Sequence, residues 1–309
     1  MTPPTMPRRT HTRIAGRDGA VLAGAFRAAR DSVRKRPLPM NEPDETLDHA
    51  RDHGNTGPST LRWLRVAGAD AAAAFVIERL LRTIDAAASP PLIGFATGAT
   101  FAPFFTRLAN AFASGRLTPD AFVATHLDEY LGFGVDRRGG MVDELFRACP
   151  AFRAMHATGR FLAVPSDGTE ASIAAHERRI DAAGGIALQL VGIGRNGHVA
   201  FAEPGTDPRR GFHRTVLAAS TRADAVARFA PDEPPREAVT AGIRSILAAH
   251  RIVLVAIGAS KADAIAAMAT APNQPECPAS FLRAHPRSTV VVDPEAGARL
   301  PAECEDSRS

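Results

Sequence analysis

The sequence predicts an α/β protein with a Rossmann-like, mostly parallel sheet and helices on both of its faces. Short, continuously apolar runs such as RIVLVAIG at 251–258 and STVVVD at 288–293 are typical of strands that are buried on both sides. Between such runs lie segments whose apolar residues are three and four positions apart, which is the spacing of amphipathic helices. Regular alternation of the two patterns favours a parallel sheet covered by helices.

The alternation begins at residue 61, where LRWLRVAG predicts a strand and the alanine-rich segment after it predicts a helix with one apolar face. PLIGFAT then has the apolar run of a buried strand, and helical spacing returns after it. The elements expected in the first half are strands at 61–68, 91–97 and 121–127 and helices at 70–88, 101–114 and 141–148.

In the second half, IALQLVGI and RIVLVAI predict buried strands, and the alanine-rich stretches around them predict helices. AVTAGIRSILAA is interpreted as part of one such helix, whereas the stretch that precedes residue 235 is less regular. The elements expected here are helices at 169–183, 235–249, 261–270 and 278–284 and strands at 186–193, 251–257 and 288–292.

Residues 1–58 differ in composition from the rest of the chain. They are rich in Arg, Pro, Asp and His, and a segment this polar cannot bury enough apolar surface to fold alone. We therefore expect a flexible basic extension at 1–58, followed by a single α/β domain over 59–309. At 309 residues and 45% hydrophobic, the chain is long enough for a large core.

Charge and composition limit the classes of partner. The net charge of +4 divides into +3 from residues 1–60 and +1 from the remainder, so the folded body is nearly neutral. With a single Trp and a single Tyr, it lacks the basic and aromatic surface that nucleic-acid binding requires. No apolar run approaches the ~20 residues of a membrane helix. We expect neither nucleic acid nor a membrane as partner.

The cysteines bear on the compartment. Cys149, Cys277 and Cys304 are odd in number and widely spaced, which fits neither a disulfide framework nor a zinc site. This pattern indicates a reducing, cytoplasmic environment.

The most informative segment is LVGIGRNGHVAFAEPGT at 190–206. It ends a buried strand and places a histidine, His198, and a carboxylate, Glu203, in one loop. Glycines such as Gly197 keep side chains out of the turn, so that backbone can pass close to a ligand. If this motif stood alone in a sequence, it would be interpreted as an ordinary glycine-rich turn.

Three further strand ends carry polar residues: ATGAT at 96–100, THLDEYLGF at 125–133 and IGASK at 257–261. In open parallel sheets, ligands bind outside the carboxyl ends of the strands. All four segments follow such ends, so we expect them to converge on one site although they span much of the chain.

The segment at 96–100 is typical of an anion cradle. Thr97, Gly98, Ala99 and Thr100 lie between a strand and a helix start, where free backbone N–H groups and the positive helix end meet two hydroxyls. Lys261, which opens another helix directly after its strand, is positioned to add a charge to the same phosphate. Taken singly, an N-capping loop and a solvated lysine are equally good interpretations.

Asp128 and Glu129 follow an otherwise apolar strand, which predicts that the first carboxylate lies at the floor of a pocket. Adjacent side chains of an extended segment point in opposite directions, so one can face a substrate while the other supports the structure. Burial makes a carboxylate more basic, which suits abstraction of a proton next to a carbonyl. We expect Asp128 to be the catalytic one.

Five blocks together resemble one known family: LDEYLGF, GIGRNGHVAFAEPGT, AVTAGIRSILAA, AIGASKADAI and PASFLRAHP. In order and spacing, residues 61–293 resemble the glucosamine-6-phosphate deaminase (isomerase) family, which shares its fold with the 6-phosphogluconolactonases. The resemblance implies conversion of glucosamine 6-phosphate and water to fructose 6-phosphate and ammonia, without a metal or an organic cofactor. The implied partner is a small phosphosugar, with a homo-oligomer as an open alternative to a monomer.

The resemblance also implies roles for individual residues. Asp128 matches the base that moves a proton between C2 and C1, His198 the acid–base that opens the sugar ring, and Glu203 the carboxylate that tunes that histidine. Asn196 stands where many members carry an aspartate that partners the histidine. Substrate contacts are implied for Thr97, Gly98, Ala99, Thr100, Glu129, Gly197, Arg228 and Lys261, with no metal ligands.

Departures from the family pattern leave alternatives open. Ala99 and Phe101 replace a small residue and a proline, and a positive φ at position 99 would disfavour alanine. GVDRRGGMV at 134–142 replaces a HPxSY-like run that contacts the sugar. The alternatives are a galactosamine-6-phosphate deaminase or isomerase, a 6-phosphogluconolactonase and, from another class, a sugar-phosphate-sensing regulator.

The polar composition of residues 1–58 predicts that they contribute nothing to the site. A protein that begins at residue 59 is therefore expected to release ammonia from glucosamine 6-phosphate with the same kcat/KM as the full chain. An unfolded or inactive truncated protein would contradict this assignment of the extension.

Overall fold

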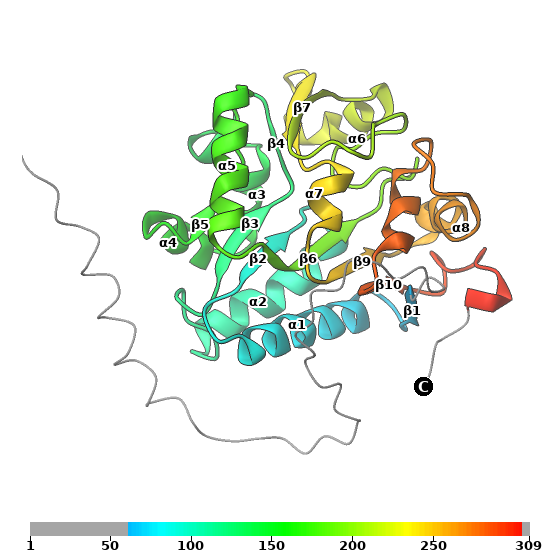
Figure 1. Ribbon diagram of the computed structural model, residues 1–309, viewed down its shortest axis with the longest axis horizontal. Coiled ribbons are helices and arrows are strands. Elements are labelled where there is room, and N and C mark those ends of the chain that lie inside the picture. The colour runs from blue at the N-terminus through cyan, green and yellow to red at the C-terminus, as the bar shows by residue number, and fades with distance from the viewer. Residues whose placement is uncertain (1–60, 305–309) are drawn as a thin grey trace, which may run out of the picture. The chain divides into compact units, whose positions relative to one another are not determined.

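The computed structural model describes residues 61–304, so the predicted extension at 1–58 lies outside the described residues. A seven-stranded sheet, in which every pairing is parallel, runs through the described part in the order β1-β10-β9-β6-β2-β3-β5 (Figure 1). This confirms the predicted fold class. The strands are β1 (Arg62–Arg65), β2 (Leu92–Phe95), β3 (Val123–His126), β5 (Phe161–Leu162), β6 (Ile186–Gly192), β9 (Ile252–Ala256) and β10 (Ser288–Val292).

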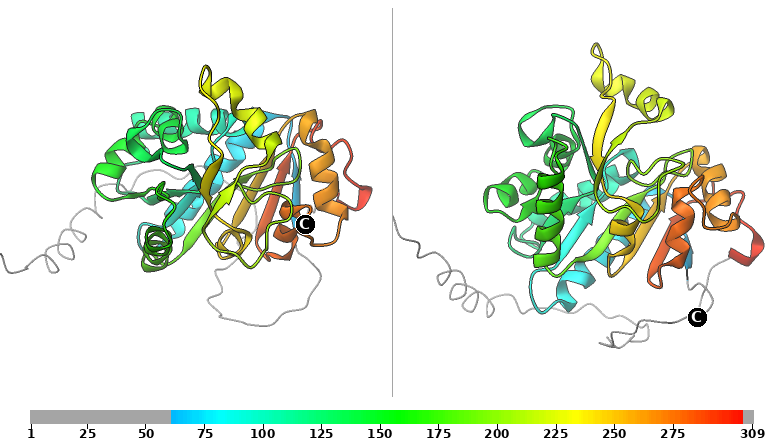
Figure 2. Two further views of the ribbon diagram at one scale, coloured as in Figure 1. Left: turned by 90° about the horizontal axis from the view of Figure 1, so that it is seen from above. Right: turned by 45° about the horizontal axis from the view of Figure 1, so that its top comes forward.

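Helices lie on both faces of this sheet (Figure 2). The α-helices are α1 (Ala69–Ala86), α2 (Ala102–Ala113), α3 (Met141–Ala148), α4 (Ala151–Ala157), α5 (Glu170–Ala182), α6 (Ala219–Phe229), α7 (Ile243–Leu247) and α8 (Ala262–Thr270). Short 3-10 helices occupy Gly134–Asp136, Ala99–Phe101, Ala259–Lys261, Pro278–Ala284 and Ala302–Cys304. α1 packs against α2 on one face of the sheet, and α5 and α7 lie on the other face. An ion pair between Glu177 of α5 and Arg244 of α7 joins the latter two helices.

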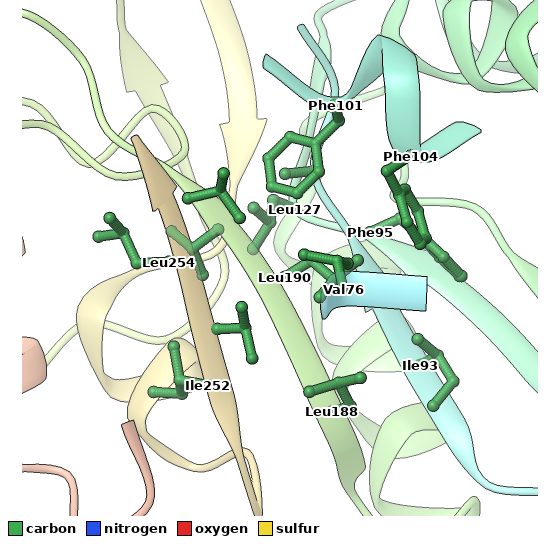
Figure 3. Packing of buried hydrophobic residues seen from close by; sticks show 14 of the residues in the cluster. Val76, Ile93, Phe95, Phe101, Phe104, Leu127, Leu188, Leu190, Ile252 and Leu254 are labelled. Atoms are coloured by element: carbon green, nitrogen blue, oxygen red, sulfur yellow. The ribbon is translucent and has the colours of Figure 1, made fainter. Parts of the chain in front are cut away.

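The main core lies between the sheet and these helices. Figure 3 shows Val76 of α1 over the central strands, next to Ile93 of β2 and Leu190 of β6. Phe101 and Phe104 extend the same cluster at the start of α2, and all five side chains are almost completely removed from water. Burial of each contributes about 1.5–3 kcal/mol, so the strand ends that carry the polar loops are held rigidly.

A second, three-stranded antiparallel sheet consists of β4 (Asp128–Tyr130), β8 (Glu237–Thr240) and β7 (His213–Val216), in the order β4-β8-β7. The prediction of one helix over 235–249 is therefore wrong in its first half. Residues 237–240 pair with two strands, Ala241 N–H donates to Leu127 C=O at 2.7 Å, and α7 begins only at residue 243. Tertiary pairing overrides the local helical pattern here.

Besides the strands β4 and β8, four elements were not expected from the sequence: α4, β5, β7 and α6. β5 has two residues and β7 four, and each acquires its strand conformation from a partner elsewhere in the chain. Figure 2 shows β7 and α6 (yellow) projecting together beyond the main sheet. Within residues 61–304, no helix combines the length and the apolar character needed to cross a bilayer.

Candidate active site

The four polar loops leave four neighbouring strands. β9, β6, β2 and β3 are adjacent in the sheet and parallel, so their carboxyl ends lie at one edge. The segments 257–261, 193–206, 96–101 and 127–133 follow these ends in that order. The topology therefore brings to one edge the segments that the sequence places far apart.

His198 and Glu203 lie together in the loop after β6. The imidazole Nδ1 is 3.4 Å from Glu203 Oε2, and both side chains are largely buried. Asn196 connects the pair: its Nδ2 donates to Glu203 Oε2 at 3.1 Å, and its Oδ1 accepts the His198 backbone N–H at 3.2 Å. Thr221 of α6 donates its hydroxyl to Glu203 Oε1. The amide at 196 thus makes a donor contact that an aspartate could not make.

These contacts determine the charge of Glu203. Burial alone would raise its pKa, but the neighbouring His198 and the hydrogen bonds from Thr221 and Asn196 outweigh that effect and lower the pKa to about 2. Glu203 is therefore ionised at neutral pH. The His198 ring therefore lies beside a fixed negative charge.

Two glycines shape this loop. Gly194 lies directly under the His198 ring, where a β-carbon would overlap ring atoms. Gly197 adopts a φ of 85°, which glycine tolerates without strain, and its carbonyl accepts the Ala279 N–H at 2.9 Å. Gly197 thus shapes the turn through its backbone.

Asp128 lies on β4, opposite Thr240 of β8, and is 7% exposed. The Thr240 hydroxyl accepts the Phe201 N–H at 2.9 Å, so β8 connects the strand of Asp128 to the loop of His198. Burial, with the negative charges of Glu129 and Glu144, raises the pKa of Asp128 to about 8 although Arg228 opposes the shift. No hydrogen bond to the Asp128 carboxylate is found among residues 61–304.

Glu129 has the opposite environment. Its side chain is completely buried and accepts three backbone N–H groups, those of Tyr130 at 2.8 Å and of Met141 and Val142 at 3.0 Å. These bonds hold the start of α3 against β4. The division of labour expected for adjacent carboxylates is therefore visible in the contacts. Glu129 supports the backbone. Both of its carboxylate oxygens accept backbone N–H groups, so neither is free for the predicted contact with substrate.

His126, two residues before Asp128, was not singled out in the sequence. Its Nε2 accepts the Val164 N–H and its Nδ1 donates to the Asp128 carbonyl, both at 2.9 Å. Burial, with the charge of His176, lowers the pKa of His126 to about 3, so the ring stays neutral. It holds the backbone of Asp128 in place. A polar residue at the end of an apolar strand was the available signal.

The predicted anion cradle has the expected local geometry. Gly98 adopts a φ of 98°, and a 3-10 helix over Ala99–Phe101 leads into α2. The positive φ falls on Gly98 and not on Ala99, so alanine is compatible with the loop. The Thr97 hydroxyl lies 3.2 Å from Met141 Sδ. Thr100 lies within the 3-10 helix and is partly buried.

Arg228 lies on the last turn of α6 and faces this cradle. Its guanidinium pairs with Glu144 and lies 3.4 Å from Met141 Sδ. Glu144 Oε1 also accepts the Gly98 N–H at 2.7 Å. Glu144 was not recognised in the sequence, because a carboxylate in the first turn of an amphipathic helix is an ordinary feature there.

Lys261 follows β9 at the end of the 3-10 helix Ala259–Lys261. Burial lowers its pKa, with Asp224 and Arg195 as the charged neighbours that oppose and assist the shift. No ion pair of Lys261 occurs in the described part of the chain. Gly258 before it has a φ of 88°, which repeats the conformation of Gly98.

The predicted residues thus form two clusters. Asp128 lies with Arg228, Glu144 and the cradle, and His198 lies with Glu203, Asn196 and Thr221. α6 contributes to both clusters, through Thr221 and Arg228. No group of His, Cys, Asp and Glu within 61–304 is arranged to hold a metal ion. The arrangement provides a basic carboxylate, an imidazole–carboxylate pair and a glycine turn at a helix start, close to the guanidinium of Arg228.

Comparisons with known proteins point in one direction. The model of the family described as glucosamine-6-phosphate isomerases/6-phosphogluconolactonase matches residues 66–291. A glucosamine-6-phosphate deaminase from Cellvibrio japonicus is 36% identical over 216 residues, which cover 68% of this chain and 80% of that protein. One from Streptomyces avermitilis is 34% identical over 219 residues, which cover 68% and 81%.

Solved structures show the same similarity. A monomeric glucosamine-6-phosphate deaminase matches with a TM-score of 0.72 and 27% identity, over 77% of this chain and 100% of that one. The 6-phosphogluconolactonase from Trypanosoma cruzi matches with a TM-score of 0.65 and 17% identity, over 80% and 99%. The second similarity shows the fold alone.

The position of Gly194 under the His198 ring predicts the effect of Gly194→Ala. The added β-carbon should displace the ring from Glu203 and lower the kcat for ammonia release by about 100-fold, since small misplacements of catalytic groups cost that much. Gly192→Ala is the matched control, because its β-carbon would only touch the Phe101 ring at 3.7 Å. Equal rates for the two variants would show that the position of the ring is unimportant.

Proposed function

Because the chain belongs to the glucosamine-6-phosphate isomerase/6-phosphogluconolactonase family, we propose that it is a glucosamine-6-phosphate deaminase. It converts glucosamine 6-phosphate and water to fructose 6-phosphate and ammonia by an aldose–ketose isomerisation coupled to deamination. The observation that carries the proposal is Asp128, a buried carboxylate whose pKa is raised to about 8 and which lies beside a cationic anion-binding loop. The relatives that match most of the chain bear the name of this activity.

In the proposed mechanism, the cradle at 97–100 and the cations Arg228 and Lys261 hold the phosphate. His198 protonates the oxygen of the sugar ring, and the sugar opens. The ionised Glu203 stabilises the positive charge that the His198 imidazole carries while it holds a second proton. The open chain then presents its C2 proton to Asp128. Asn196 and Thr221 keep Glu203 in position through their hydrogen bonds.

Asp128 removes the C2 proton and returns it to C1 through an enediol-type intermediate. The amine nitrogen loses one proton and the C1 oxygen gains one in the same conversion, so that the C1 aldehyde and the C2 amine become a C1 alcohol and a C2 imine. Water adds to the imine carbon, ammonia leaves, and the C2 ketone of fructose 6-phosphate remains. The raised pKa suits a group that must accept and release the same proton.

The alternatives within the family differ in substrate. A panel of glucosamine 6-phosphate, galactosamine 6-phosphate and 6-phosphogluconolactone separates the two deaminases from the lactonase. Release of ammonia from the first at the highest kcat/KM is the expected result.

We further propose that the protein works in the cytoplasm, because Cys149, Cys277 and Cys304 are all free thiols.

Replacement of the base tests the mechanism. Asp128→Asn keeps the shape of the side chain but cannot accept a proton, so we expect kcat to fall by roughly 100- to 10,000-fold while substrate still binds. Ammonia release and calorimetric binding of glucosamine 6-phosphate are the two measurements. Undiminished turnover in this variant would refute the assignment of the base.

The pH dependence provides an independent test. A carboxyl group with a pKa of about 8 is protonated below that pH, so log kcat/KM should fall by about one unit per pH unit below 8. The profile is measured from pH 6.5 to 9, above the second pKa of about 6 of the phosphate group. A rate that stays constant down to pH 6.5 would show that Asp128 is ionised there, as an ordinary aspartate would be.

A further inference from the structure

The anion-binding loop already holds a negative charge in the free protein. Glu144, on α3, accepts the Gly98 backbone N–H at 2.7 Å through Oε1 and pairs with Arg228 through Oε2. A backbone N–H at a helix start and a guanidinium are the groups that bind phosphate in proteins. The Glu144 carboxylate thus makes two of the contacts that we assign to the phosphate of the substrate.

The Glu144 side chain is not enclosed by the fold. Its side chain remains about one fifth exposed, and with Arg228 it lines an open cavity of about 650 Å³. Arg138 lines the same cavity, as do Asp232 and the ion pair of Arg147 with Asp143, so a displaced carboxylate has space and a cation, Arg138, within the same cavity. The fully buried Glu129, with its three backbone bonds, shows what a purely structural carboxylate looks like in this protein.

A phosphate cannot share these contacts with an ionised carboxylate. The phosphate monoester carries a charge of about −1.5 to −2 at neutral pH, and the Glu144 carboxylate already lies on Gly98 and Arg228. The positive charge of Arg228 opposes the rise in pKa of both Asp128 and Glu129, and its guanidinium forms an ion pair with Glu144. Entry of the phosphate therefore requires Glu144 to leave Gly98 and Arg228.

We infer that Glu144 is an intramolecular competitor for the phosphate of the substrate, and that it determines which anions the site accepts. The inference rests on the proposed function for the identity of the substrate, but not for the binding of phosphate itself. A doubly charged phosphate, with three acceptor oxygens, outcompetes the carboxylate for the two donors. A sugar acid with a single carboxylate has the same charge and the same acceptor group as Glu144, so it does not displace Glu144 from Gly98 and Arg228.

The test compares Glu144→Gln with wild type. Glutamine keeps the size of the side chain but loses the charge that binds Arg228, so the affinity for inorganic phosphate, measured by calorimetry, should rise by about tenfold. KM for glucosamine 6-phosphate should fall by a similar factor. Glu144→Ala, which removes both contacts, should give at least the same gain.

Asp143→Asn is the matched control. Asp143 is the neighbouring residue on α3, and its carboxylate accepts the Gly139 N–H and pairs with Arg147, away from Gly98. The variant loses the same charge from the same helix, but Asp143 contacts Gly139 and Arg147 instead of Gly98 and Arg228. Its phosphate affinity should therefore stay close to that of wild type. An equal gain in Asp143→Asn would reduce the effect to general electrostatics and overturn the inference.

A second readout distinguishes this role from a structural one. Because the charge of Glu144 contributes to the raised pKa of Asp128, the acidic limb of the kcat/KM profile should move to lower pH in Glu144→Gln. Unchanged or weakened phosphate binding in both Glu144 variants would overturn the inference. If wild type released no ammonia from glucosamine 6-phosphate, the proposed function would fail, whereas the phosphate affinities would still decide the role of Glu144.

Discussion

Four parallel strands that end at one edge of a covered sheet are the constraint on which the site depends. β9, β6, β2 and β3 are buried by helices on both faces, so polar groups can gather only where the strands end. After β2 and β9 the chain turns through a glycine with nearly the same left-handed conformation, at Gly98 and Gly258, into a short 3-10 helix. The two turns direct helix starts toward the same edge of the sheet.

The adjacent carboxylates Asp128 and Glu129 show how burial can serve structure or chemistry. Glu129 is compensated by three backbone N–H groups, which is the usual condition for a buried carboxylate. Asp128 has burial and like charges but no such donors in the described part of the chain, so its proton is held more tightly. Pairing of β4 with β8 keeps this segment extended, and adjacent side chains of an extended segment point to opposite faces.

α6 joins the two halves of the chemistry. Its first turn places Thr221 on Glu203, and its last turn places Arg228 on Glu144. A movement of this helix would therefore alter the contacts both of Glu203, which lies beside His198, and of Glu144, which lies on Gly98. The helix projects with β7 beyond the main sheet (Figure 2), and Phe229 at its end packs against Tyr130 and Phe133.

Much of this molecule follows from local sequence. The apolar strands, the helices between them and the glycine turns after β2, β6 and β9 are recognisable because their patterns depend only on residues close in the chain. The motif at 190–206 likewise contains His198, Glu203 and Asn196 within a few positions, so their proximity needs no tertiary information. Even the different duties of Asp128 and Glu129 follow from the alternation of an extended segment.

The remainder was decided by the tertiary structure, because it depends on contacts between distant segments. Residues 237–240 have a helical pattern but form β8, since the hydrogen bonds of β4 and β7 are available only in the folded chain. His126 supports Asp128 only because Val164 comes to its other nitrogen. Glu144 has the appearance of a solvated helix residue until Gly98 and Arg228, 46 and 84 positions away, are brought to its carboxylate.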